Sequence, residues 1–477
     1  MKFLVLFVMV FNSLFSAEPF ISEKDAEDIA TEVYIYGYPL VTMEMTRRIM
    51  TNVTKPENGH APMGQFFHMQ QYPNSSFKDV TAPNADTLYS TAWLNVKDEP
   101  YILELPNESG RYYLMPMLSA WTDVFAVPGT RTTGTKAGTY AIVGPQWNGS
   151  LPEKVTELRS PTNLVWILGR TYSTGTSEDY KIVHALQKEY LLKPLSSYKK
   201  EYTPPKGTVN SSINMTTPVR EQVNQLDANA YFKLLADLLK DNPPTGADSL
   251  IVTKMKRIGI VPGKDFDSSK LSAKALKSLR KAPVNAQEKL QDLAESSGNI
   301  VNGWYFTTKT GLYGTDYLQR AKITFIGLGA NKPQDAIYLV AKVDLTGKTL
   351  NGNSDYVVHF PKGGLPPVKG FWSLTIYNSN YFFVPNKLDK YTVSPRDDLL
   401  INPDGSLDIY IQRVSRGDGK EANWLPSPDD DFVLMLRMYW PEDSVVNGSW
   451  VMPGVQNLGP AKQQVGFFDR MLERYYY

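Results

Sequence analysis

Several aromatic side chains of this sequence stand near amide, carboxylate or guanidinium side chains, mostly in segments predicted as loops or strand ends. Binding groups usually occupy such positions. Ring faces bury the CH groups of a sugar or a small amphipathic molecule, while polar neighbours pair with its hydroxyls. We therefore predict a ligand site, and the alternative is that the rings fill a domain interface. The candidate ligand-binding residues are Asn84, Trp121, Asp123, Arg131, Tyr317, Trp372, Asn423 and Trp424.

Two carboxylates, Asp86 and Asp123, are candidate catalytic bases for a hydrolase of a carbohydrate or amide bond. A competing interpretation makes Asp86 a structural partner of Arg170, with Asp335 and Arg437 repeating the pair. A carboxylate and a guanidinium on inner strands would offset each other's desolvation. The sequence does not give the separation between carboxylates, so it leaves open whether the protein is an enzyme.

Tyr317 belongs to a second polar and aromatic group, on a predicted helix. Tyr313, Asp316, Tyr317 and Arg320 recur at spacings of three and four residues, which places them on one helix face. This face could line a cleft or could buttress the neighbouring domains.

Metal and cofactor chemistry has little support in the sequence. The four histidines, His60, His68, His184 and His359, form neither HExxH nor His-X-His, and there is no cysteine. Nucleophile-elbow, Walker A and GxGxxG motifs are also absent from the sequence. We expect no metal site and no cofactor.

The elements that would position these residues form a repeat. Asp86, Tyr89 and Ala92 recur 249 residues later as Asp335, Tyr338 and Ala341. Further on, a second set recurs at an offset of 267 residues: Gly138, Ile142, Ser160, Pro161, Arg170 and Tyr172 return as Gly405, Ile409, Ser427, Pro428, Arg437 and Tyr439. A repeat of this length predicts two related β-domains. Residues shared by both copies should serve the fold, and polar residues found in one copy are better site candidates.

The predicted fold is mainly β with α additions: two duplicated jelly-roll-like β-sandwiches, an N-terminal helix and an inserted helical region. The N-terminal helix should break or kink at Pro39. Another long helix should run from about Trp304 to Gly327. The predicted boundaries are a signal peptide at 1–17, a helical segment at 18–76, the first sandwich at 77–175, a helical insert and linker at 176–328, and the second sandwich with a tail at 329–477.

Composition restricts the partners. The 477 residues are 42% hydrophobic, 12% aromatic and 21% charged, as in a globular protein. With 50 basic and 49 acidic residues the net charge is +1, so the protein lacks the excess of positive charge that would attract nucleic acid. We expect no nucleic-acid partner.

The N-terminus predicts export. Lys2, an apolar run at 3–10 and the small residues Ser16 and Ala17 have the layout of a signal peptide, and no other segment could span a membrane. We expect a secreted or periplasmic protein without a membrane span after cleavage. Without cysteines, its stability must come from core burial and assembly, so we expect a homo-oligomer. Seven Asn-X-Ser/Thr sequons would fit a glycoprotein or a coincidence: Asn52, Asn74, Asn107, Asn148, Asn210, Asn214 and Asn447.

Two long motif sets carry a family resemblance. PNADTLYSTAWLNV, GRYYLMPMLSAWTDVF and SPTNLVWILGRT resemble domain of unknown function 1254. YGTDYLQRAKITFIGLGAN, HFPKGGLPPVKGFWSLTIYN and EANWLPSPDDDFVLMLRMYWP resemble its usual partner, domain of unknown function 1214. The resemblance implies an exported protein with two jelly-roll-like sandwiches and helical additions. It implies no established reaction and no catalytic residues.

Three functions fit these observations. The leading hypothesis is a secreted protein that binds a glycan or small amphipathic ligand between its β-domains. The alternatives are a carboxylate-dependent hydrolase and a structural protein of an outer layer or particle.

Overall fold

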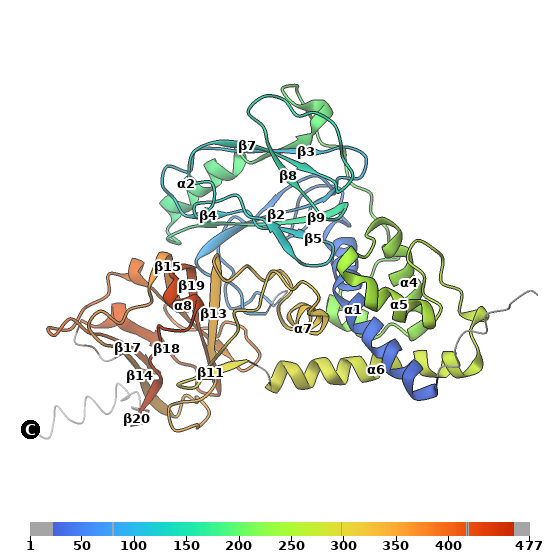
Figure 1. The fold of residues 1–477 in the computed structure, drawn as a ribbon. Coiled ribbons are helices and arrows are strands. Elements are labelled where there is room, and N and C mark those ends of the chain that lie inside the picture. The colour runs from blue at the N-terminus through green and yellow to red at the C-terminus, as the bar shows by residue number, and fades with distance from the viewer. Residues whose placement is uncertain (1–21, 79–80, 297, 416, 418, 462–477) are drawn as a thin grey trace, which may run out of the picture.

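The computed structural model describes residues 22–78, 81–296, 298–415, 417 and 419–461, so the predicted signal peptide lies outside the described residues. Two β-sandwiches lie one above the other, and a helical unit lies beside them (Figure 1). None of the described helices is long and apolar enough to cross a membrane.

The first sandwich pairs a six-stranded sheet with a four-stranded sheet. The six-stranded sheet contains β1 (Phe67–His68), β2 (Thr87–Asn95), β4 (Tyr113–Leu114), β5 (Met117–Ser119), β6 (Val124–Ala126) and β9 (Leu164–Tyr172). The four-stranded sheet contains β3 (Tyr101–Leu105), β7 (Gly138–Val143), β8 (Thr156–Arg159) and β10 (Leu191–Pro194). The strand orders are β1-β2-β9-β5-β6, with β4 on β9, and β10-β3-β7-β8. Helix α2 (Ser177–Lys188) precedes β10, so strands of this sandwich continue into the range predicted as the helical insert.

The second sandwich has the same two-sheet plan. Its six-stranded sheet contains β11 (Asn299–Val301), β12 (Trp304–Phe306), β13 (Ala336–Ala341), β15 (Val368–Asn378), β16 (Thr392–Val393) and β19 (Phe432–Pro441). Its four-stranded sheet contains β14 (Ser354–Phe360), β17 (Leu407–Gln412), β18 (Trp424–Pro426) and β20 (Val455–Pro460). The orders are β11-β12-β13-β19-β15-β16 and β18-β17-β14-β20. A short helix, α8 (Asp443–Val446), follows β19.

The two sandwiches share most of their strands in the same order, which confirms the predicted duplicated architecture. β2 and β9 correspond to β13 and β19, and β3, β7 and β8 correspond to β14, β17 and β18. Both copies contain one parallel pair, β7 with β8 and β17 with β18. The registers agree as well, because Tyr89 is opposite Arg170 in one copy and Tyr338 is opposite Arg437 in the other.

Each sandwich has its own apolar core between its sheets. In the first, Leu94 of β2 and Ile167 of β9 meet Leu103 of β3. The central strand β9 is buried along almost its whole length, which explains its nearly continuous apolar sequence. Gly169 is required there, since a Cβ would lie 2.3 Å from the sulfur of Met115.

The helical unit contains the N-terminal helix, most of the insert and the helix before β13. Its helices are α1 (Glu23–Met50), α3 (Val219–Asn224), α4 (Ala228–Asp241), α5 (Ser249–Arg257), α6 (Ala273–Ser296) and α7 (Tyr317–Gly327). Residues 33–44 of α1 are all buried, so this helix forms the centre of the unit. A helix that is apolar on all sides is expected in such a position.

Two helix predictions differ from the structure. Helix α1 is not broken at Pro39, because packing on all sides outweighs the hydrogen bond that proline cannot donate. The helix predicted from Trp304 begins only at Tyr317, and residues 299–306 form β11 and β12 instead. Gly303, Gly311 and Gly314 have positive φ angles of 81°, 74° and 56°, which interrupt a helix.

Candidate functional site

Arg320 lies in the first turns of α7, where the helical unit meets the first sandwich (Figure 1). Its side chain is buried, and aromatic rings from three elements surround the guanidinium group. The guanidinium carbon is 4.8 Å from the ring centroid of Trp121, 5.3 Å from that of Tyr317 and 5.4 Å from that of Tyr36. The Tyr36 ring in turn contacts Trp121 at 4.8 Å and Tyr317 at 4.9 Å. We call these four residues, with Asp123, the Arg320 cluster.

The guanidinium group of Arg320 is incompletely paired. Its Nε and Nη2 atoms are buried and make no hydrogen bond. Within the described part of the chain, no carboxylate lies within 4.0 Å of it, and Arg320 is only 4% exposed. Burial and the neighbouring Asp248 carboxylate raise the pKa of the Tyr36 hydroxyl. Because most buried polar groups in proteins are paired, the unpaired donors of Arg320 are unusual and make this cluster a candidate site.

Two carboxylates at the edge of the cluster have partners of their own. Asp123 Oδ1 accepts a hydrogen bond of 3.1 Å from the backbone N–H of Tyr313. Burial raises the pKa of Asp123, and the positive charge of Arg320 acts in the opposite direction. Asp248 Oδ1 accepts a hydrogen bond of 2.7 Å from the Tyr317 hydroxyl. Both carboxylates thus orient their neighbours while contributing negative charge near Arg320.

Two backbone features hold the cluster in place. The turn between β5 and β6 contains Thr122 with a φ of 68°, closed by a hydrogen bond from its N–H to the Ser119 carbonyl. This turn presents Trp121 and Asp123. On the opposite side, the Val124 N–H donates to the Gly311 carbonyl at 2.7 Å, which fixes the segment that leads to Tyr317. Gly311 is required, because a Cβ would lie 2.8 Å from a backbone nitrogen.

The structure brings together three of the predicted contacts, Trp121, Asp123 and Tyr317. The predicted helix face contains Arg320 as well as Tyr317, but residue spacing does not single out Arg320 as the centre of the cluster. Tyr36 was missed. Its available signal is the YIYGY run inside a helix that is apolar on all sides, where hydroxyl groups need partners.

Asn84, Asp86 and Arg131 lie elsewhere, in the contact between the two sandwiches. Asn84 Nδ2 donates to the Tyr439 hydroxyl at 2.6 Å. Arg131 Nε lies 2.7 Å from Asp335 Oδ1, and Asp86 is fully buried. The residues of this contact therefore pair mainly with one another.

The ion pairs across this contact differ from those expected within each domain. Asp86 of the first sandwich pairs with Arg396 of the second at 2.8 Å, while Asp335 of the second pairs with Arg131 of the first. The expected partner of Asp86, Arg170, instead donates to the Asn331 side chain at 2.9 Å. Each copy thus supplies its arginine to the carboxylate of the other copy.

Arg437 and Arg170 have equivalent roles in the same contact. Arg437 donates to the Ala82 and Pro83 carbonyls at 2.9 and 3.3 Å, and Arg170 reaches the Gly329 carbonyl at 3.4 Å. Both acceptor segments precede the aspartate of the opposite sandwich. Conserved positions of the repeat thus tie the two copies together.

The remaining predicted contacts lie inside the second sandwich, away from the Arg320 cluster. Trp372 belongs to the core between its sheets. Asn423 bridges loops by donating to the Leu400 and Asp408 carbonyls at 2.8 and 2.9 Å. Trp424 donates from its indole nitrogen to the Gln412 carbonyl at 2.8 Å.

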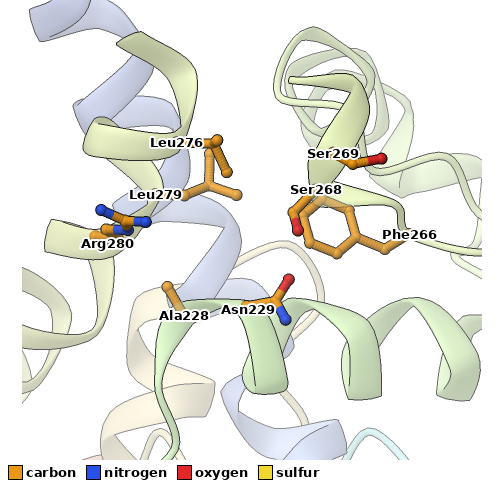
Figure 2. Close-up of a pocket in the computed structure, with 8 residues that line it drawn as sticks. All are labelled: Ala228, Asn229, Phe266, Ser268, Ser269, Leu276, Leu279 and Arg280. Carbon is orange, nitrogen blue, oxygen red and sulfur yellow. The ribbon is translucent and has the colours of Figure 1, made fainter. Parts of the chain in front are cut away.

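A cavity of about 360 Å³ lies in the helical unit, between α4, α6 and the turn at Ser268–Lys270. Figure 2 shows Leu276 and Leu279 facing Phe266 across it. Its polar groups are Asn229, Ser268, Ser269 and Arg280. No polar atom that lines it is buried without a partner, in contrast with the Arg320 cluster.

The fold and this geometry define a two-sandwich protein with a helical unit and a buried, partly unpaired arginine. The chain contains a domain described as protein of unknown function DUF1254 at residues 63–194 and one described as DUF1214 at residues 335–443. Trp121 and Asp123 lie within the first of these ranges. Tyr36, Tyr317 and Arg320 lie outside both.

Solved structures resemble the chain over most of its length. The VPA0106 protein from Vibrio parahaemolyticus is 26% identical, with a TM-score of 0.69 over 91% of this chain and 100% of that one. A putative uncharacterized protein from Burkholderia cenocepacia is 10% identical, with a TM-score of 0.41 over 92% of this chain and 95% of that one. A search of proteins with curated functions found no match.

Proposed function

We propose that this chain is an exported binding protein that takes up a small amphipathic ligand at the Arg320 cluster. The unpaired Nε and Nη2 atoms of Arg320 carry this proposal. A ligand that accepted hydrogen bonds from them would remove the desolvation penalty of two buried donors. The signal-like N-terminus supports export.

The surroundings of Arg320 suit a ligand with an apolar part. Trp121 and Tyr36 belong to the apolar core of the helical unit, and Tyr317 packs against it. Tyr317 is half-buried, and the neighbouring residues 314–316 are exposed, so the cluster lies close to the surface. Ligand sites commonly combine apolar walls with a few convergent polar groups.

This proposal places the ligand beside α7 instead of between the β-domains. The contact between the sandwiches contains two reciprocal ion pairs, Arg131 with Asp335 and Arg396 with Asp86. A ligand there would have to displace charge pairs that are already buried, which is costly. The Arg320 cluster requires no such displacement.

A binding screen tests the proposal. The melting temperature of the protein should rise with at least one member of a set of oligosaccharides, short-chain acids, amines and neutral amphiphiles. Trp121→Phe, which alters the cluster, should reduce the shift. Trp424→Phe, which changes a predicted contact outside the cluster, should preserve it. Equal shifts in both variants, or no shift with any compound, would refute the proposal.

Asp123 supports a hydrolase as a second candidate. Burial raises the pKa of Asp123, as is useful for a general acid or base, and its charge interacts with that of Arg320. Turnover of glycoside or amide substrates that is lost in Asp123→Asn would favour this function. Binding of such compounds without turnover would dismiss it.

A further inference from the structure

We infer that the ligand of the Arg320 cluster carries a single carboxylate, held side-on by Nε and Nη2 of Arg320. This inference rests on the proposed function and adds the chemical class of the ligand. Such a side-on contact fixes the two carboxylate oxygens of the ligand and leaves the rest of the ligand against the aromatic rings of the cluster.

The geometry of the free donors carries the first step. The Nε–H and Nη2–H groups of arginine lie along one edge of the planar guanidinium and point in nearly parallel directions, which matches two carboxylate oxygens. The protein itself contains this arrangement. Arg47 donates from Nε and from Nη2 to the two carboxylate oxygens of Glu44, both at 2.7 Å. Arg320 offers the same edge, buried and without a partner.

The charge of the cluster carries the second step. A buried guanidinium without a counterion within 4.0 Å favours an anion over a neutral hydroxyl compound. Asp123 and Asp248 contribute negative charge nearby, and Asp248 is already bonded to the Tyr317 hydroxyl. Both carboxylates repel any anion, and the repulsion is stronger for a dianion such as phosphate than for a monocarboxylate.

The aromatic surroundings carry the third step. Tyr36 and Trp121 present ring surface beside the guanidinium, whose Nε and Nη2 donors are unpaired. A carboxylate attached to a small apolar or aromatic group would use both features. An inorganic anion would use only the charge.

The test compares butyrate and benzoate with butyramide and benzamide, their neutral isosteres, and with inorganic phosphate. Binding is measured by isothermal titration and by the shift of the melting temperature. Both carboxylates should bind, and each amide should bind at least about ten-fold more weakly, since an amide offers one acceptor oxygen and no charge. Arg320→Lys keeps the charge but loses the parallel donors, so carboxylate affinity should fall at least about ten-fold. Arg159→Lys, on an exposed arginine of the first sandwich, should bind as the wild type does.

The outcomes separate this inference from the proposed function. Amides or oligosaccharides that bind as tightly as the carboxylates, with affinity lost in Trp121→Phe, would overturn the ligand class and leave the site standing. Phosphate binding more tightly than benzoate would also overturn it. Carboxylate binding that Arg320→Lys leaves unchanged, or no carboxylate binding at all, would overturn the inference. Because Arg320→Lys could unfold the chain, its melting curve without ligand is measured first, and Trp121→Phe, which alters the ring surface beside the guanidinium, provides a milder second variant. Carboxylate affinity that this variant leaves unchanged would count against the Arg320 cluster as the site.

Discussion

The buried arginines of this protein differ in whether their guanidinium groups are paired. Arg170 and Arg437 have no carboxylate within 4.0 Å among the described residues, yet both donate to carbonyl oxygens or side chains of the opposite sandwich. Arg320 is buried to a similar degree but leaves Nε and Nη2 unpaired. Hydrogen bonds to backbone carbonyls make the first two structural residues. The absence of such bonds is the reason why we propose Arg320 as the ligand-binding residue.

Carboxylate binding should depend on pH through Asp123. Its pKa is raised, chiefly by burial, with Asp248 adding to the rise and Arg320 and Lys332 opposing it. As the pH falls toward this raised pKa, Asp123 takes up a proton and repels a bound anion less. Benzoate affinity, measured by titration at successively lower pH from neutral, should therefore rise as the pH falls.

Asp123→Asn supplies the matched variant for this pH profile. The asparagine oxygen can still accept the hydrogen bond from the Tyr313 N–H, while the negative charge is removed. Affinity should be higher at neutral pH and should vary less with pH than in the wild type. A slope that survives in Asp123→Asn would assign the pH dependence to another group.

Glu108 should lower the stability of the protein at alkaline pH. Its side chain is 2% exposed; Oε1 accepts a hydrogen bond from the Tyr190 hydroxyl and Oε2 has no partner. Burial raises the pKa of Glu108 to about 7, while Tyr190 and Arg111 act to lower it. The folded state therefore binds this proton more tightly than the unfolded state, and stability falls as the pH rises from about 4.5 to about 7.

Glu108→Gln should remove this dependence. The contribution is roughly 2–3 kcal/mol, so the variant should be more stable than the wild type in denaturant unfolding at about pH 8 and similar near pH 5. Glu157→Gln, on a half-exposed strand position, serves as the control and should change neither value. If the free energy of unfolding changes with pH in the same way in the wild type and in Glu108→Gln, Glu108 is not the group that causes the loss of stability.

At the scale of elements, the strands were more predictable than the helices. The sequence predicted the duplicated sandwiches because two blocks of residues recur, one containing Tyr89 and Tyr338 and the other containing Arg170 and Arg437. In the structure Tyr89 stands opposite Arg170, and Tyr338 stands opposite Arg437. The sequence did not predict short strands such as β11 and β12, because strands of three residues are too short to show a clear alternation of apolar and polar residues. Helix α1 passed through Pro39 because tertiary burial, which local sequence does not reveal, decides the outcome.

The contact between α1 and α4 makes a specific prediction about Gly37. A Cβ at this position would lie 2.6 Å from a methyl carbon of Leu235, which is fully buried. Gly37→Ala should destabilise the protein by roughly 1–3 kcal/mol through overpacking. Leu235→Ala alone should cost roughly 2–5 kcal/mol, and the double variant should cost less than the sum, because the new methyl group occupies part of the space.

Denaturant unfolding of the four proteins measures this coupling. Gly327→Ala in α7 is the control, since a Cβ there meets no atom within 4 Å, and it should be neutral or slightly stabilising. Strict additivity of Gly37→Ala and Leu235→Ala would show that the two positions are not in contact.

At the scale of the whole molecule, reciprocal ion pairs join the two sandwiches. Each sandwich extends an arginine to an aspartate of the other, Arg396 to Asp86 and Arg131 to Asp335. The sequence correctly indicated that the repeated aspartates and arginines serve the fold. It could not show that partners cross between domains, because a repeat does not specify whether its units pair internally or with each other.

Breaking one of these pairs should be costly. Arg396→Met leaves the fully buried Asp86 carboxylate without its guanidinium, so the free energy of unfolding should fall by roughly 3–5 kcal/mol. Adding Asp86→Asn should restore part of this loss, because position 86 then no longer carries a buried carboxylate without its arginine. Arg413→Met, which breaks an exposed pair with Asp429, should cost less than about 1 kcal/mol. Equal effects of the two arginine variants would contradict the proposed role of the domain contact.

The sequence alone could not identify most of the candidate site, because residue type does not show where a side chain lies in the fold. Trp121, Asp123 and Tyr317 were chosen as polar or aromatic residues, and the structure places them together. Trp372, Asn423 and Trp424 were chosen by the same rule but lie within the second sandwich. Residue type alone does not distinguish a core tryptophan from a site tryptophan. The distinguishing feature, a donor that folding leaves unpaired, exists only in three dimensions.

A crystal structure of the protein grown with benzoate tests the central claim most directly. We predict that one carboxylate oxygen lies within about 3.2 Å of Nε of Arg320 and the other within about 3.2 Å of Nη2. The phenyl ring should lie against Tyr36 or Trp121. Benzoate bound only elsewhere, or Nε and Nη2 paired with a side chain of the protein itself, would contradict the account.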